Sequence, residues 1–307
     1  MITNLTVERL SSSVMAVPPL CRNADLTLNE AENEKLIRHI EAGGIRTLLY
    51  GGNANFYHIS VSEYEQVVSC IERLSGQDTL VIPSVSPLWG PMMDQARILR
   101  KHKFPTVMVL PLIGSTTSRG VEEGIRRFVD AAGVPALLYI KNDGYIDVAE
   151  AARLAESKTI SGIKYAVVRE NYAEDPYLRS LCDSVDKRIL ISGVGEQAAV
   201  VHMRDFGLPG FTAGGVCVAP ALCVAMLKAI RAGDWARADH IRELFLPLEN
   251  YRVAINPVRV LHEAVRLAGI ANTGPLLPLM SNLEESHFPR IREAIKAVLE
   301  AQARIVG

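Results

Sequence analysis

The sequence has no long apolar run. Nowhere in its 307 residues does an uncharged hydrophobic stretch approach the ~18 residues that a membrane-spanning helix needs. The N-terminus, MITNLTVERLSSS, also lacks the basic-then-apolar pattern of an export signal. These two absences predict a cytoplasmic protein without a membrane segment.

An excess of charge of one sign is lacking too. The formal net charge is −1, with no basic block and no acidic tail, so nothing favours nucleic acid or an anionic membrane surface as a partner. The five cysteines are scattered and form no C-x-x-C pair, which predicts reduced thiols and no metal site. The G-x-S-x-G turn of serine hydrolases is absent as well.

What the sequence does contain is a regular alternation of strand-like and helix-like segments. Several strand-like runs, such as TVMVLPL and PALLYI, are apolar throughout, which is typical of parallel strands covered on both faces. The runs lie at 14–17, 47–50, 79–83, 106–110, 136–140, 160–164, 188–192 and 210–213, with amphipathic stretches between them, for example 30–41, 61–74, 91–102, 120–132 and 198–206. This alternation predicts a (β/α)8 TIM barrel. A doubly wound open sheet is the main alternative, but Pro18-Pro19-Leu20 follows the first run where a glycine-rich phosphate turn would be expected.

Beyond residue 230 the strand-like runs stop. Helices are predicted at 235–246, 257–267 and 284–301, with Asp234 suited to cap the first and Pro257 to begin the second. We therefore expect two parts: a barrel with the active site in residues 1–230, and a C-terminal three-helix segment in residues 231–307.

A lysine ends the sixth predicted strand. The segment TISGIKYAVV is apolar up to Ile163, continues with Lys164 and then returns to apolar residues. Barrel active sites lie at the C-terminal ends of the strands, and Tyr139 lies near the end of the preceding strand, 25 residues earlier. Because neighbouring strands are ~4.8 Å apart, an amine and a phenol at matching depths can meet.

That pair suits Schiff-base chemistry. Only neutral lysine attacks a ketone, and at an unperturbed pKa of ~10.4 about 0.04% of it is neutral at pH 7. Desolvation lowers that pKa, the resulting iminium withdraws electrons from the neighbouring carbon, and Tyr139 would shuttle protons. The residues alone leave a simpler interpretation open, in which Lys164 reaches solvent and Tyr139 packs with a wet hydroxyl.

Five segments together suggest a family: SGIKYA, PALLYIKND, LLYGGNANFYHIS, LISGVGE and PGFTAGGVCVAP. The first resembles the lysine strand of the dihydrodipicolinate synthase / N-acetylneuraminate lyase superfamily, and the second is similar to its tyrosine strand. The third stands where that superfamily has a G-T-T-G-E loop after strand two. The fourth and fifth resemble its S-G-D/E segment and its glycine-rich strand-eight segment. The resemblance covers nearly the whole chain.

The resemblance implies a class I aldolase-like lyase acting on pyruvate or a longer 2-keto acid, with Lys164 and Tyr139 as catalytic residues. It implies neither metal nor organic cofactor, and it implies a homotetramer or homodimer. Lys141 would bind a distal carboxylate or phosphate, unless it is only a solvated loop charge. Backbone N–H groups of the loop would hold the keto-acid carboxylate. The expected substrate-binding residues are Gly52, Asn53, Ala54, Asn55, Lys141, Gly193 and Thr212.

Several positions depart from the resemblance. Gly52 and Asn53 stand where the synthases have two threonines that bind the carboxylate and relay protons. Leu112-Ile113 replaces the tyrosine pair that each synthase subunit lends to its neighbour, and Gly144 replaces the arginine that grips the second substrate. The asparagine of the strand-eight motif is replaced by Cys217. We therefore expect a protein that is not an efficient dihydrodipicolinate synthase. Tyr57, His58 and Tyr145 are the candidates to replace the missing relay, although a lone histidine such as His58 is more often a polar packing residue.

One branch of the superfamily fits better. GNANFY and YIKND are similar to the G-T-G-E-F-F and Y-N-R-D-N segments of 5-dehydro-4-deoxyglucarate dehydratases, although Asn55 replaces the acid and Asn142 and Asp143 are exchanged. This favours acidic or polyhydroxylated 2-keto sugar substrates. The alternative is a non-catalytic 2-keto-acid-binding or regulatory protein on the same barrel. The retained lysine argues against it, because a site that only binds gains little from a costly desolvated amine.

Overall fold

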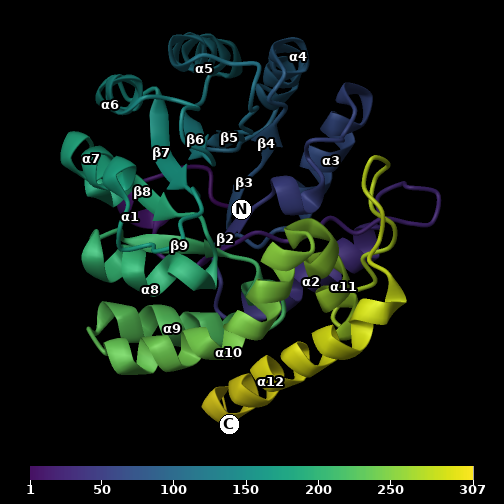
Figure 1. Cartoon of the computed structure of the whole chain (residues 1–307). Coiled ribbons are helices and arrows are strands. Elements are labelled where there is room, and N and C mark those ends of the chain that lie inside the picture. Colours follow the sequence, from purple (N-terminus) through teal and green to yellow (C-terminus); the bar gives the residue numbers. More distant parts are fainter. Residues whose placement is uncertain (307) are drawn as a thin grey trace.

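Parallel strands form a barrel at the centre of the protein (Figure 1). The computed structural model describes residues 1–306. The strands follow one another in the order β3-β2-β1-β9-β8-β7-β6-β5-β4, and β3 and β4 are consecutive parts of one strand, interrupted at Pro83. The strand predicted at 79–83 covers β3 and ends just before β4. The sheet is therefore an eight-stranded ring, as predicted. The strands are β1 (Met15–Ala16), β2 (Thr47–Leu49), β3 (Leu80–Ile82), β4 (Ser84–Val85), β5 (Val107–Val109), β6 (Ala136–Ile140), β7 (Ile160–Tyr165), β8 (Leu190–Ser192) and β9 (Gly210–Ala213).

Helices surround this ring and alternate with the strands, which confirms the (β/α)8 barrel (Figure 1). Their N-termini carry the expected signals: Asn29 and Asp175 each accept a backbone N–H bond with the side chain, and Pro220 and Pro257 occupy first turns. The helices are α1 (Val7–Leu10), α2 (Glu30–Ala42), α3 (Val61–Leu74), α4 (Trp89–Leu99), α5 (Ser118–Ala132), α6 (Val148–Glu156), α7 (Pro176–Ser184), α8 (Glu196–Asp205), α9 (Pro220–Arg231), α10 (Trp235–Ala254), α11 (Pro257–Leu267) and α12 (Phe288–Val306).

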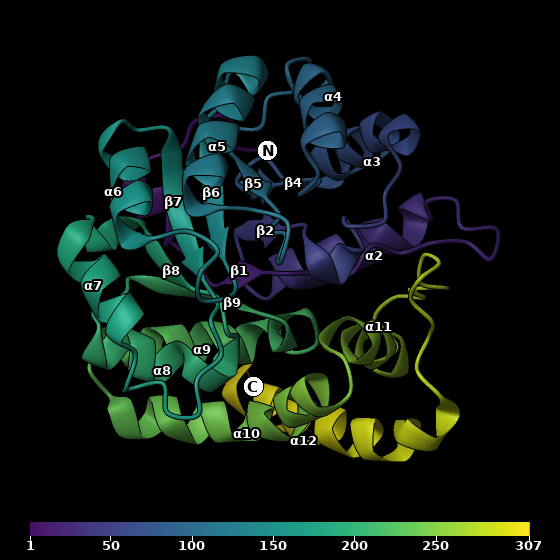
Figure 2. The same ribbon diagram turned by 45° about the horizontal axis from the view of Figure 1, so that its top comes forward.

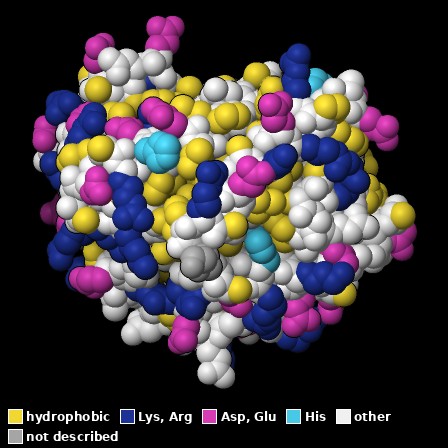
Figure 3. Space-filling view, turned by 90° about the horizontal axis from the view of Figure 1, so that it is seen from below, with side chains coloured by type: hydrophobic (Ala, Val, Ile, Leu, Met, Phe, Trp, Pro, Cys, Tyr) yellow, Lys and Arg dark blue, Asp and Glu magenta, His cyan; other side chains and the backbone are white. Residues whose placement is uncertain are grey.

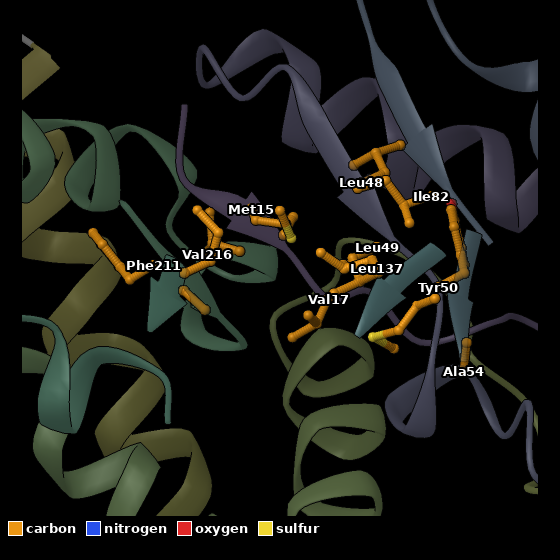
Figure 4. Packing of buried hydrophobic residues seen from close by; sticks show 14 of the residues in the cluster. Met15, Val17, Leu48, Leu49, Tyr50, Ala54, Ile82, Leu137, Phe211 and Val216 are labelled. Atoms are coloured by element: carbon orange, nitrogen blue, oxygen red, sulfur yellow. The ribbon is translucent and has the colours of Figure 1, made fainter. Parts of the chain in front are cut away.

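The strands are buried on both faces. Met15, Leu48, Leu49, Ile82 and Leu137 are at most 1% exposed and belong to one continuous core (Figure 4). Burying a residue of this size contributes roughly 1.5–3 kcal/mol, which is comparable to the conformational entropy lost in ordering it. This explains why the apolar strand-like runs were informative.

Helix α10 is longer than predicted. It ends at Ala254, beyond the predicted limit at residue 246, and it contains Pro247 in its interior. A proline inside a helix costs ~3 kcal/mol or more, but Phe245 and Leu248 on either side of it are fully buried, and this burial offsets that cost. Helices α10, α11 and α12 pack on one another alongside the barrel, and α10 and α12 also pack on α9 (Figure 2). The division of the chain at residue 230 stays a prediction.

The molecular surface mixes charges. On the face shown in Figure 3, basic and acidic side chains are interspersed with apolar ones. Within residues 1–306, none of the helices is both long enough and apolar enough to cross a membrane.

Candidate active site

Lys164 and Tyr139 lie side by side. They are direct partners in the parallel pairing of β6 and β7, so their side chains leave the sheet at the same depth. The Lys164 Nζ lies 4.2 Å from the centre of the Tyr139 ring. Both residues line a cavity of about 330 Å³ at the C-terminal ends of the strands. The structure thus brings the two predicted catalytic residues into contact.

The cavity favours the neutral form of Lys164. Its side chain is buried, and burial, together with the positive charges of Lys141 and Arg252, lowers its pKa to about 7. About half of the amine is then neutral at pH 7. Burial raises the pKa of Tyr139, so its phenol keeps its proton at neutral pH. A nucleophilic amine thus lies beside a proton donor.

Gly193 leaves room for the lysine. A Cβ at this position would lie 2.9 Å from Cγ of Lys164 and 2.7 Å from Cβ of Ala166. The Gly193 amide already donates a hydrogen bond to the Tyr165 carbonyl, at 2.6 Å. Gly193 lines the cavity, but its contribution there is space, because its amide is already paired.

Only some of the predicted residues in the loop after β2 line the cavity. Gly52 and Asn53 line it, and within the part of the chain that the structure describes their amides have no acceptor. The amide of Ala54 donates to the Gly51 carbonyl at 3.0 Å, and Ala54 lies in the core (Figure 4). Asn55 is buried, and its side chain accepts a bond from the Leu277 amide. The structure does not place Ala54 or Asn55 in the cavity wall.

Helix α11 fixes this loop from outside. Burial lowers the pKa of His262 to about 4, so the imidazole is neutral, and its Nε2 lies 3.1 Å from the Asn53 carbonyl. The Asn53 side chain donates to the Val17 carbonyl at 3.2 Å. The two free amides are therefore held in place from both sides.

Lys141 and Thr212 line the same cavity. Lys141 is exposed at its mouth, directly after β6, and the protein atoms around it lower its pKa. The loop that follows is fixed by Arg169, whose Nη2 donates to Asp143 at 2.7 Å and whose Nε donates to the buried Asp175 at 2.9 Å. Lys141 therefore projects from an anchored loop.

Among the cavity residues that were not predicted, two are charged, and both lie in the unexpected extension of α10. Glu249 and Arg252 are buried side chains in the cavity wall. Arg252 Nη1 donates to both oxygens of the Glu249 carboxylate, at 2.7 and 2.8 Å, and its Nε donates to the Pro257 carbonyl at 3.3 Å. The sequence signal for them is an i,i+3 Glu–Arg pair, which in a helix more often lies on the surface.

A second carboxyl group lies behind this pair. Glu196 is fully buried, and burial together with the neighbouring Glu249 raises its pKa to about 8. It therefore carries a proton at neutral pH, and its Oε1 accepts a weak bond from Cys223 Sγ at 3.5 Å. Cys217 and Cys223 are buried free thiols.

The suggested substitutes for the missing relay are dispersed. Tyr57 packs beside Gly52. It also lies close to Tyr139, since a negative charge on Tyr57 contributes to the raised pKa of Tyr139. The Tyr57 hydroxyl donates a hydrogen bond to the Pro111 carbonyl at 3.3 Å. Tyr145 instead lines a neighbouring apolar cavity with Leu110 and Leu112. Tyr57 is therefore the nearer candidate.

The site defines a class of protein, a (β/α)8 barrel with a buried lysine at a strand end. Residues 11–298 match the Dihydrodipicolinate synthetase family, and the chain belongs to that family. A 4-hydroxy-tetrahydrodipicolinate synthase of Methylobacterium radiotolerans is 28% identical over 91% of this chain and 93% of its own length. A probable 5-dehydro-4-deoxyglucarate dehydratase of Xanthobacter autotrophicus is 25% identical, over 89% and 91%. The fold is that of the dihydrodipicolinate synthase from Bacillus clausii, with a TM-score of 0.84 and 22% identity over 95% of this chain and 99% of the other.

Proposed function

We propose that this protein is a lyase that forms a Schiff base between Lys164 and pyruvate or a longer 2-keto acid. The observation that carries the proposal is the buried Lys164 amine, with its pKa of about 7, in contact with the Tyr139 ring. A buried amine is costly to maintain, and a site that only bound keto acids would gain little from it.

The reaction begins when the neutral amine forms a bond to the ketone carbon of the substrate. The resulting carbinolamine loses water and leaves a positively charged iminium. A bond to the neighbouring carbon, C–H or C–C, then breaks, and its electron pair flows into the iminium to give an enamine. Tyr139 carries the protons between substrate and solvent, and final hydrolysis restores the amine.

The amides of Gly52 and Asn53 would hold the keto-acid carboxylate. Within residues 1–306 these two adjacent N–H groups have no acceptor, and such a pair can form a small anion-binding concavity. Helix α11 keeps their loop in position. We also propose a homotetramer or homodimer, by analogy with the family, and acidic or polyhydroxylated 2-keto sugars as substrates.

The proposal is tested by borohydride trapping with a panel of 2-keto acids, read by intact mass and peptide mapping. The expected result is the mass of the reduced adduct on the peptide that contains Lys164. Lys164→Ala should abolish the adduct, and the matched variant Lys141→Ala should retain it. Labelling at Lys141 alone, or no adduct with any keto acid of the panel, contradicts the proposal.

A further inference from the structure

Only part of the Arg252 guanidinium is hydrogen-bonded to other groups of the described residues. Its Nη1 and Nε are bound to Glu249 and to the Pro257 carbonyl. Its Nη2 has no acceptor within the described residues. Because Nη2 is not one of the fully buried polar atoms that lack a partner, it keeps some solvent-accessible surface in the residue that lines the cavity. One edge of the fork is therefore anchored, while the other remains available to a ligand in the cavity.

The position of this guanidinium is fixed by packing as well. A Cβ at Gly214 would lie 2.2 Å from Nη1 of Arg252, so the backbone at the end of β9 approaches the guanidinium as closely as a glycine permits. Glu249 is buried and holds the same nitrogen through both carboxylate oxygens. A preorganised guanidinium loses little entropy when it binds a carboxylate.

The charges around the cavity also favour an anion. Glu249 neutralises Arg252, the nearby Glu196 carries its proton, and Lys141 has no ion-pair partner within the described residues. Lys141 follows β6 and Gly214 follows β9, with β7 and β8 between those two strands, so positive groups approach Lys164 from two sides. The keto-acid carboxylate is already provided for by the amides of Gly52 and Asn53, which leaves Arg252 without a ligand.

The size of the cavity fits a longer molecule. A volume of about 330 Å³ falls within the range of roughly 300–1,000 Å³ of sites that hold drug-sized ligands, which are larger than pyruvate. Val168 and Val253 are exposed apolar side chains that line it, and they offer contacts for a carbon chain between two polar ends.

We propose that Arg252, positioned by Glu249, binds a second carboxylate at the far end of the substrate, so that the preferred substrate is a 2-keto dicarboxylic acid. This inference rests on the proposed Schiff-base function and specifies its substrate class. Glu249 is a positioning residue in this arrangement, and Lys141 contributes positive potential at the mouth.

The test compares keto acids of equal length that differ only in the terminal carboxylate. The pairs are 2-oxoglutarate with 2-oxopentanoate, and 2-oxoadipate with 2-oxohexanoate. Apparent dissociation constants for the imine are read from borohydride trapping at a series of concentrations. The wild-type protein is expected to bind the dicarboxylate of at least one pair roughly 30-fold more tightly or better, as for a charge-assisted contact in a cavity.

Substitutions at Arg252 and Glu249 test whether Arg252 causes the preference for the dicarboxylate. Arg252→Gln should reduce the ratio of the two dissociation constants to about 1, whereas Arg252→Lys should keep part of the preference because the charge remains. The ratio is the readout, because loss of the Arg252 charge also affects the pKa of Lys164 and hence the trapping of both compounds. Arg252→Gln leaves Glu249 buried without its partner, so the double variant Arg252→Gln/Glu249→Gln serves as the variant that avoids an unpaired charge.

The outcomes separate the two proposals. Equal trapping of both members of both pairs by the wild-type protein overturns the dicarboxylate inference and leaves the Schiff base standing. So does an equal loss for both members in a folded Arg252 variant. If the wild-type protein traps none of the four compounds and does not trap pyruvate either, both the proposed function and the inference are overturned.

Discussion

The amine of Lys164 lies over the ring of Tyr139, 4.2 Å from its centre, because the two residues are direct partners across β6 and β7. Parallel pairing fixes both side chains at one depth, and neither backbone needs to move for the two groups to cooperate. The pair is therefore preorganised by the sheet, and its separate contributions can be tested by single substitutions.

Tyr139→Phe should slow turnover by a factor on the order of 10²–10⁴, the usual range for general acid–base catalysis, while trapping of the imine changes less. Steady-state kinetics and borohydride trapping on the same preparation measure the two effects. Tyr57→Phe and Tyr145→Phe are measured alongside, because these two phenols are the other candidates for the proton relay. Turnover at the wild-type rate in Tyr139→Phe would transfer the proton relay to one of those two phenols.

The rate of imine formation should depend on pH with a midpoint near 7. Because the pKa of Lys164 is lowered to about 7, the neutral amine is scarce at pH 5, and its fraction rises through pH 7 and levels off above pH 8. Initial rates of trapping with cyanoborohydride give the profile. Lys141→Gln removes a like charge, so it should move the midpoint to higher pH. A rate that rises only above pH 9 would be inconsistent with a desolvated amine.

Gly193→Ala should impair imine formation without loss of the fold. The added methyl group would meet the Lys164 stem at 2.9 Å and Ala166 at 2.7 Å, so the lysine stem must be displaced from its present position. The matched control is Gly124→Ala in α5, where nothing lies within 4 Å of the added Cβ and alanine is the better helix former. Circular dichroism and trapping rates are compared for the two variants. Unchanged trapping in Gly193→Ala would mean that the lysine tolerates displacement.

The protein should be an inefficient dihydrodipicolinate synthase. Gly144 is exposed and in the left-handed conformation at φ 75°, and it offers no guanidinium where the synthases have one. The guanidinium of Arg252 lies elsewhere, against the end of β9. Loss of a buried charge-assisted contact costs ~2–5 kcal/mol, or about 30- to 5,000-fold. A coupled assay with pyruvate and aspartate semialdehyde, beside one with 4-deoxy-5-keto sugar acids, measures this. A kcat/KM for the semialdehyde of ~10⁴ M⁻¹s⁻¹ or more would contradict the prediction.

The barrel and its lysine were predictable because both depend on regular spacing. Strands buried on both faces leave apolar runs, and the interval between Tyr139 and Lys164 equals one strand–helix unit. The arrangement of the loop after β2 was only partly predictable: the sequence GGNA indicates a tight turn, but which amides remain free depends on the internal bonds of Ala54 and Asn55.

Glu249 and Arg252 were not predictable from the same signals. Pro247 indicated the end of a helix, and charged residues in a helical pattern usually face solvent. Tertiary packing overrides both expectations. Because Phe245 and Leu248 are buried, the helix continues beyond Pro247, and Arg252 lies on its buried side. A contact between distant parts of the chain leaves no periodic trace in the sequence.

The two roles proposed for the cavity thus belong to different parts of the chain. The amine that we propose forms the Schiff base belongs to a barrel strand, whereas the arginine that we propose binds the distal carboxylate belongs to a helix that follows the last strand. Selectivity in such a protein can diverge by changes at the periphery while the strand motifs remain the same. Names inferred from the lysine and tyrosine strands therefore describe the reaction type, and residue 252 is the place to look when relatives with identical strands are sorted by substrate.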